Sequence, residues 1–277
     1  MIEASAALLL AAGLWAGAQN ALAGGGSFVT IPALMAAGLD ARVANLTSTV
    51  AVFPGQITTA LANRRLVSGI GPFSFLILLG ISLVGGVLGA LLLLATPTDL
   101  FSRMLPWLVL VATLLFARGA FGKKLGDAHL KPLPFGLGQF GVAIYGGYFG
   151  GGIGFLMLAL FTLAGAAVKE AQANKNALAS AMNFSGALVF ILSGEVDWSH
   201  ALPLCVGTVI GGYGGARLIA YVPDKALKLL VVLIGLALFL TFMIMTPVFD
   251  ASWTHGIAPY LDKTMDFKTA WGAAIEP

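Results

Sequence analysis

The chain has 277 residues, of which 58% are hydrophobic and only 10% are charged, and its net charge is +3. A soluble domain carries about 25% charged residues, so this composition excludes a protein with a water-covered surface. The few charges are scattered, which excludes a nucleic-acid partner because no basic stretch is dense enough to follow a phosphate backbone.

Ten hydrophobic segments follow one another, most of them close to the ~20 residues that a helix needs to cross the hydrocarbon layer. The first is expected to be retained, since residues 1–3 lack the positive charge of a cleavable signal peptide. Two short segments, 27–38 and 152–165, each follow a glycine run, so we expect half-helices or re-entrant pieces there. In chain order the segments are 4–22, 27–38, 42–62, 70–95, 99–120, 133–149, 152–165, 170–193, 199–221 and 225–247.

Glycine runs at matching places divide the chain into two similar halves. The run at 24–26 corresponds to the run at 150–152, and the glycine-rich stretch at 84–90 corresponds to that at 210–216. The glycines of the stretches 84–90 and 210–216 are typical of close helix packing through small residues. Interrupted hydrophobic segments in corresponding positions are a pointer to a transporter's binding site. We therefore expect an all-α polytopic membrane protein with two homologous repeats, each containing a glycine-broken or re-entrant half-helix.

The charges of the loops predict which side of the membrane each loop faces. The lysine-bearing linker 122–134 is expected on the cytoplasmic side, and so is Arg64-Arg65, two crossings earlier. The counterpart of this arginine pair in the second half, 195–197, contains acidic residues but no Lys or Arg, so we expect it outside.

The other pair of loops shows the opposite exchange. The loop 96–103 has one arginine, whereas its counterpart contains Lys225 and Lys228. This exchange favours an inverted repeat of five plus five segments, while a parallel arrangement of four plus four would place both lysines outside. The expected organisation is a first transmembrane repeat (1–121), a cytoplasmic linker (122–134), a second transmembrane repeat (135–249) and a polar or interfacial C-terminal tail (250–277).

The glycine runs and the polar clusters behind them form the candidate binding site. Lipid cannot satisfy the N–H groups that a glycine break exposes, so the break must face a cavity or packed protein. The helix that follows directs its positive dipole end at that cavity, which favours an anion. Alternatively, each polar cluster is a helix cap with interhelical hydrogen bonds. The candidate substrate-binding residues are Gly24, Gly25, Gly26, Ser27, Asn45, Thr47, Ser48, Thr49, Gln56, Gly151, Gly152, Gln172, Asn174, Lys175, Asn176 and Asn183.

Lys175 stands several residues inside a membrane segment, and an ionisable residue there is a functional hypothesis by default. It could attract an anionic substrate, or it could titrate. The alternative is a lysine whose side chain reaches the membrane surface.

The sequence contains no feature of an enzyme or of a cofactor protein. No nucleophile–base pair, nucleotide-binding loop or metal-ligand spacing occurs, and the single cysteine, Cys205, excludes a disulfide within the chain. We therefore expect no catalysis, no cofactor and no metal.

The chain resembles the TauE/SafE sulfite exporter family, also called TSUP or DUF81, from about residue 8 to 240. The residues that carry the resemblance are the runs at 24–32 and 43–49 and the signature from 173 to 198. The resemblance implies a bacterial or archaeal inner-membrane carrier, with members linked to the export of sulfite, sulfoacetate or related oxyanions. The run Gln-Ala-Asn-Lys-Asn at 172–176 departs from the Gly-Thr-Ser type seen in many first halves, so the resemblance does not single out sulfite.

We therefore expect a multi-pass inner-membrane secondary transporter, working as an exporter by alternating access. Its substrate would be a small anion such as sulfite, sulfoacetate or another sulfur oxyanion or organosulfonate. The other expected partners are the lipid bilayer, a coupling proton or ion, and a second copy of the chain in a homo-oligomer. The alternatives are an anion channel, a transporter of a different small organic anion, and a membrane assembly subunit.

Overall fold

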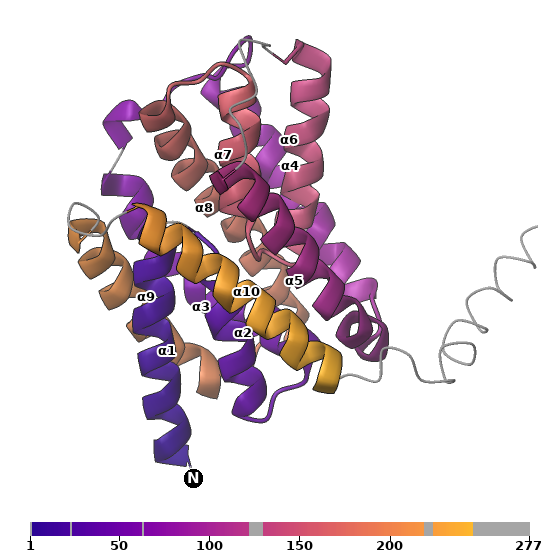
Figure 1. Ribbon diagram of the computed structural model, residues 1–277. Coiled ribbons are helices and arrows are strands. Elements are labelled where there is room, and N and C mark those ends of the chain that lie inside the picture. Colours follow the sequence, from indigo (N-terminus) through magenta and orange to yellow (C-terminus); the bar gives the residue numbers. More distant parts are fainter. Residues whose placement is uncertain (1, 23, 63, 122–129, 219–223, 246–277) are drawn as a thin grey trace, which may run out of the picture.

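The computed structural model describes residues 2–22, 24–62, 64–121, 130–218 and 224–245 (Figure 1). Within these ranges the chain forms α-helices joined by short loops, and no strand occurs there. The helices are α1 (Ile2–Leu22), α2 (Ser27–Ala36), α3 (Ala41–Ala62), the 3-10 helix η1 (Arg64–Leu66), α4 (Phe75–Ala95), α5 (Thr98–Phe121), α6 (Pro132–Tyr148), α7 (Ile153–Leu163), α8 (Val168–Ser193), α9 (Trp198–Leu218) and α10 (Asp224–Met245).

The outer surface of these helices is suited to lipid. Three described helical stretches, Phe75–Ala95, Thr98–Arg118 and Lys169–Ser193, are long and apolar enough to cross a membrane. Leu76 and Leu192 are 74% and 78% exposed, which lipid favours and water does not. The predicted all-α polytopic fold is confirmed for the described residues, whose helices suit a protein that crosses a membrane several times.

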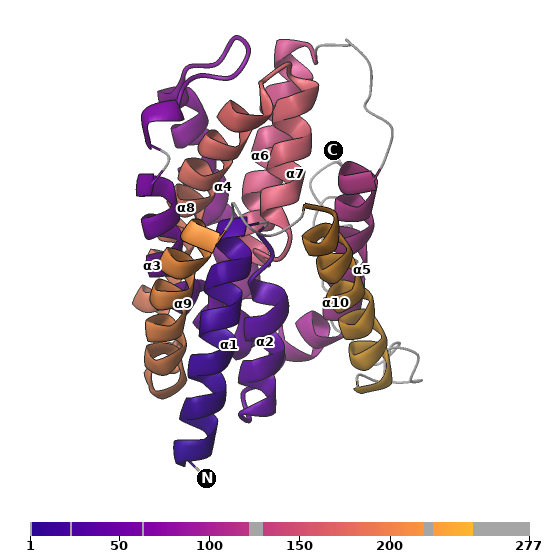
Figure 2. The ribbon, with the colours of Figure 1, turned by 60° about the vertical axis from the view of Figure 1, so that its left-hand side comes forward.

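Both expected short helices are present, with 10 residues in α2 and 11 in α7. At 1.5 Å per residue each covers roughly half of the ~30 Å hydrocarbon layer. Figure 2 shows α1 and α2 in the lower part of the molecule and α6 and α7 in the upper part. The chain turns back between each pair where glycines adopt φ values of 73° to 88°, at Gly24, Gly25, Gly150 and Gly152. Only glycine adopts this conformation readily, which is why both breaks fall on glycine runs.

Each half of the chain packs closely against the other. The helix α9 lies against α1 and α3, and α4 lies against α6 and α8. Glycines allow these contacts: a Cβ added at Gly211 would overlap the carbonyl oxygen of Leu14, and one at Gly89 would overlap that of Ile144. The expectation that the glycines spaced by four in these stretches, Gly85, Gly89, Gly211 and Gly215, serve close packing is confirmed. The first-half helix α4 thus packs on helices of the second half, and the second-half helix α9 packs on helices of the first half. This arrangement agrees with two repeats, which remain a prediction.

The loop between α8 and α9 is tied to the beginning of α3. The Arg42 guanidinium forms an ion pair with Glu195 and donates a hydrogen bond of 3.0 Å to the Leu94 carbonyl at the end of α4. The backbone N–H of Asp197 donates to Thr47 Oγ1 at 3.2 Å. Three segments from both halves, namely α3, the end of α4 and the loop between α8 and α9, are therefore joined at this end of the molecule.

The side chain of Asp197 stabilises the beginning of α9. It accepts hydrogen bonds from Ser199 Oγ at 2.5 Å and from the His200 N–H at 3.2 Å. Burial by itself would raise the pKa of Asp197, but the hydrogen bonds from Ser199 and His200, together with the His200 ring, hold this pKa below its usual value.

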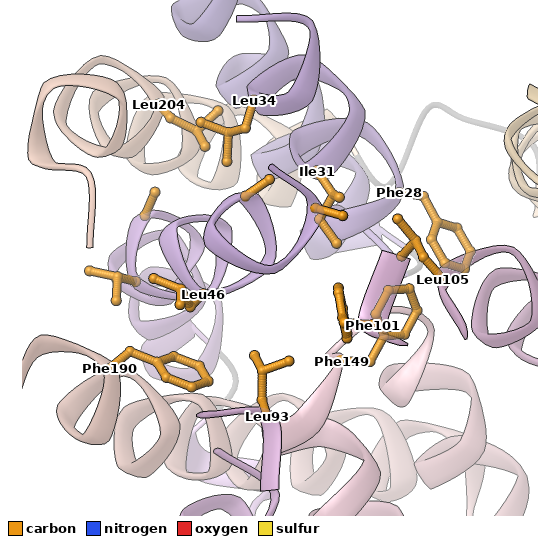
Figure 3. Close-up of a cluster of buried hydrophobic side chains, with 14 of the residues drawn as sticks. Phe28, Ile31, Leu34, Leu46, Leu93, Phe101, Leu105, Phe149, Phe190 and Leu204 are labelled. Atoms are coloured by element: carbon orange, nitrogen blue, oxygen red, sulfur yellow. The ribbon is translucent and has the colours of Figure 1, made fainter. Parts of the chain in front are cut away.

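Two clusters of buried apolar side chains fill the interior. The large core cluster lies near the Arg42–Glu195 end and joins helices of both halves through Phe28, Phe101, Phe149 and Phe190 (Figure 3). The small core cluster includes Phe135 and other residues of α4, α6, α7 and α8. The interior is thus packed on both sides of the glycine breaks.

The predicted boundaries lie within a few residues of the described helix ends, and the largest difference is at the start of α4. The predicted segment 70–95 begins too early, because Gly71 has a φ of 56° and hydrogen bonds between Ile70 and Phe73 close a turn before α4. Most of the predicted linker, the whole tail 250–277, and the side chains of Lys225 and Lys228 lie outside the described residues.

Candidate functional site

The two glycine breaks face each other. A Cβ built on Gly24 would lie 3.6 Å from the Cα of Gly154, and one built on Gly150 would lie 3.8 Å from Ser27 Oγ. The beginning of α2 therefore lies beside the beginning of α7, although the two are more than a hundred residues apart in the sequence.

A small cavity of about 30 Å³ lies where the breaks meet, next to α3 and α8. A space of this size holds one or two waters or one compact ion. Ile153 and Ala179 of the small core cluster also line it. The lining residues are Asn20, Gly24, Gly25, Ser27, Gln56, Thr59, Gly150, Ile153, Gly154, Lys175, Asn176 and Ala179.

Lys175 supplies the charge of this cavity. Its side chain is only 3% exposed, and a Cβ built on Gly154 would lie 3.6 Å from Lys175 Nζ. No carboxylate lines the cavity, and no hydrogen bond or ion pair joins Lys175 Nζ to any residue in the part of the chain that the structure describes. A buried charge without a partner is costly, so this amine needs an anion beside it or must lose its proton.

Neutral donors surround the amine. The helix α7 begins at the cavity, so the N–H groups of its first turn have no acceptor within the helix. The helix α2 also begins there, but the N–H groups of Phe28 and Val29 donate to the carbonyls of Gly25 and Gly26. The Asn176 Nδ2 is buried and has no partner among the described residues. The Gln56 Oε1 accepts from Asn183 Nδ2 at 2.6 Å, which leaves the Gln56 Nε2 as a further donor at the cavity. The site therefore has an excess of donors and positive charge, which suits an anion.

Side-chain amides of α1 hold the first break in place. The Asn20 Oδ1 accepts from the Gly26 N–H at 2.8 Å, and the Gln19 Nε2 donates to the Gly25 carbonyl at 3.2 Å. Sequence reasoning missed Asn20, although an amide pair at the end of an apolar segment and just before a glycine run was a usable signal. It also missed Thr59, which carries no local signal within α3.

Of the sequence-predicted residues, Gly24, Gly25, Ser27, Gln56, Lys175 and Asn176 line the cavity. Gly26 and Asn183 are hydrogen-bonded to lining residues, Asn20 and Gln56.

The cavity is not lined by the polar residues near the start of α3: Asn45, Thr47, Ser48 and Thr49. Asn45 Nδ2 donates to the Tyr148 carbonyl at 2.8 Å, and the hydroxyls of Ser48 and Thr30 lie 2.5 Å apart. Thr47 accepts from the N–H of Asp197, and Thr49 donates to the carbonyl of Asn45. The side chains of Asn45, Thr47 and Ser48 therefore join α3 to other segments, as the alternative interpretation of the cluster expected, whereas Thr49 bonds within α3.

The remaining four predicted residues also lie off the cavity. A Cβ at Gly151 would lie 2.9 Å from Phe28, and Gly152, with a φ of 76°, precedes α7. Asn174 accepts from the Ser68 N–H at 3.2 Å and donates to the Glu170 carbonyl. Gln172 is half-buried and does not line the cavity.

Comparison with known proteins identifies a family that covers most of the chain. The family model described as "Sulfite exporter TauE/SafE" matches residues 9–242, which confirms the resemblance seen in the sequence. The "Probable membrane transporter protein YfcA" of Escherichia coli K12 is 34% identical over 224 residues, which are 79% of this chain and 82% of that protein. A "Probable membrane transporter protein" of Haemophilus influenzae is 30% identical over 258 residues, 90% of this chain and 96% of its own.

A second match covers the C-terminal stretch. The FliP family model matches residues 226–277, and the "Flagellar biosynthetic protein FliP" of Caulobacter vibrioides is 50% identical over 46 residues, 17% of each chain. The helix α10 lies in this match, and residues 246–277 lie outside the described ranges. No solved structure matches the chain.

Proposed function

We propose that this chain, a membrane transporter that belongs to the sulfite exporter TauE/SafE family, is a secondary carrier of a small sulfur oxyanion or organosulfonate. The observation that carries the proposal is Lys175, a buried cation at a cavity between two helix beginnings to which no described residue brings a carboxylate. Such a site compensates an anion without a competing counter-charge.

The packing around the site supports a carrier that works by alternating access. The cavity is small, and the large core cluster closes the molecule on one side of it with side chains such as Phe28 and Phe149. An anion channel needs a continuous polar path, whereas apolar packing of this kind has to rearrange before an ion leaves.

Charge at the two ends supports the proposed orientation. Arg64 and Arg65 belong to η1, which follows the end of α3 and packs on the beginning of α8. Glu195 and Asp197 lie at the opposite end of α8. Under the positive-inside rule, the arginine end faces the cytoplasm. The inverted repeat and the division at the linker belong to this proposal.

A binding screen tests the substrate class. Sulfite, sulfate, thiosulfate, sulfoacetate and taurine are added to the purified protein, and its thermal unfolding temperature is measured. At least one anion should raise it, because a ligand that binds only the folded state stabilises that state. Lys175→Ala should remove the shift, whereas Lys169→Ala, an exposed lysine of the same helix, should keep it. If no anion shifts the wild-type protein, the substrate assignment is wrong.

Transport in liposomes separates the carrier from the channel. Saturable counterflow of an anion identified in the screen is the expected result. A conductance of thousands of ions per opening event would refute the carrier and favour an anion channel at the same site.

A further inference from the structure

Lys175 is the one ionisable side chain that lines the cavity in the described part of the chain. The other lining side chains are amides, hydroxyls and apolar groups. Any proton that binds or leaves at this cavity therefore does so on the Lys175 amine.

Among the described residues, the helices that pack most extensively against α8 bring no second charged group to this amine. The helices α4 and α7 contain no charged residue, and the only one in α3, Arg42, is paired with Glu195 at the far end. The two tyrosines of α6 donate hydrogen bonds elsewhere, to the Gly151 carbonyl and to the Thr96 hydroxyl. The remaining charged residues nearby are exposed, at the start of α8 and in η1: Lys169, Glu170, Arg64 and Arg65.

The transport cycle sets opposite requirements on Lys175. With an anion bound, the protonated amine is compensated. Without an anion, a closed site would contain a buried charge that no residue on the described elements neutralises, which is costly because the charge has lost its hydration. A carrier that returns empty passes through such a state, and a neutral amine does so at far lower cost. Lysine can lose its proton when buried, whereas arginine stays charged.

Resting on the proposed function, we infer that Lys175 couples anion transport to proton transport in the same direction. The neutral amine takes up one proton as one anion binds, and releases both on the other side of the membrane. The cycle moves no net charge when the anion is monovalent. Its direction then depends on the sum of the anion and proton gradients, so export requires an outward anion gradient larger than the inward proton gradient.

The test uses the full chain in liposomes that enclose a pH-sensitive dye, with the membrane potential held at zero. Methanesulfonate is the first probe, because a sulfonate stays ionised as the pH changes and any pH effect then belongs to the protein. Thiosulfate is the second probe. An inward methanesulfonate gradient should acidify the lumen by one proton per anion. In the alkaline range its Kd should rise about tenfold per pH unit, since each anion then has to bring a proton.

Two substitutions separate coupling from binding. Lys175→Arg keeps the charge, so it should bind the anion with a Kd that does not change with pH and should support exchange but no net uptake. Lys175→Gln should lose binding, and Lys169→Gln should behave as wild type. If either variant fails to fold, the proton count of the wild-type protein decides alone.

The outcomes distinguish this inference from the proposed function. The coupling is overturned if the wild-type protein takes up the anion without acidifying the lumen. It is also overturned if wild-type transport always needs an anion on the opposite side. Either result leaves an anion carrier. The same pH dependence in wild type and Lys175→Arg overturns it as well. If wild type binds neither probe nor any anion of the screen, the proposed function itself fails.

Discussion

Gly154→Ala is the smallest change that tests whether the cavity is the binding site. The added methyl would lie 3.3 Å from Cδ and 3.6 Å from Nζ of Lys175, and 3.6 Å from the Cα of Gly24. These contacts are tight enough to displace the lysine side chain by a few tenths of an ångström but not to break the packing. Gly154 lines this cavity of about 30 Å³, so the added methyl reduces the space beside Lys175.

The expected effect separates binding from stability. Alanine in a helix is favoured over glycine by up to about 1 kcal/mol, so the thermal unfolding temperature should stay the same or rise. Anion affinity should fall at least ~10-fold, the usual effect of one extra methylene in a closely fitted site.

The assay is titration of thiosulfate or methanesulfonate into purified wild-type and variant protein, with unfolding monitored in parallel. Gly141→Ala is the matched control, because a Cβ at Gly141 meets nothing within 4 Å and should leave the affinity unchanged. A Gly154→Ala protein that is folded and binds with wild-type affinity would refute the assignment of the site to this cavity.

Three further changes test the packing and the loop between α8 and α9. Glu195→Gln removes the charged partner of Arg42 and should lower the free energy of unfolding by about 1 kcal/mol, with a smaller loss at high salt; an equal loss at every salt concentration would contradict an ionic contribution. Gly211→Val should lower it by about 3 kcal/mol by forcing α1 away from α9, while Gly214→Val, with open space around its Cβ, is the control. The pKa of Asp197 is lowered by folding, so its stabilisation is complete above the usual carboxyl pKa and is lost as pH falls through the lowered value. Asp197→Asn should remove this part of the acid dependence of the unfolding temperature, and an unchanged pH profile would contradict it.

The helix breaks could be predicted from the sequence, because their cause is local. Positive φ values at Gly24 and Gly150 require glycine, and a glycine run between two apolar segments of a membrane protein is a strong sign that the helix is interrupted there. The short lengths of α2 and α7 follow from a second glycine that ends each helix, Gly38 with a φ of 108° and Gly165 with a φ of 89°.

The side chains that face the cavity could not be read from the sequence in the same way. Ser48 lies about two turns into α3 and Lys175 about two turns into α8, and each of these helices follows a short helix that begins at a glycine break. Yet Ser48 bonds to Thr30, whereas Lys175 lines the cavity. The difference depends on the rotation of each helix about its axis and on its neighbours, which are set by packing. A polar cluster at a matching position therefore predicts a buried polar group, and the tertiary contacts decide whether it joins helices or binds a ligand.

The glycine contacts of α1 with α9 and of α4 with α6 restrict how the molecule can move. Backbones this close cannot slide past each other without overlap, so each pair is a single mechanical element. Because α9 comes from the second half of the chain and α1 from the first, neither half is free to tilt by itself. The bodies that move during a cycle must each combine segments of both halves, and the flexible joints must lie within the halves, not at the linker between them.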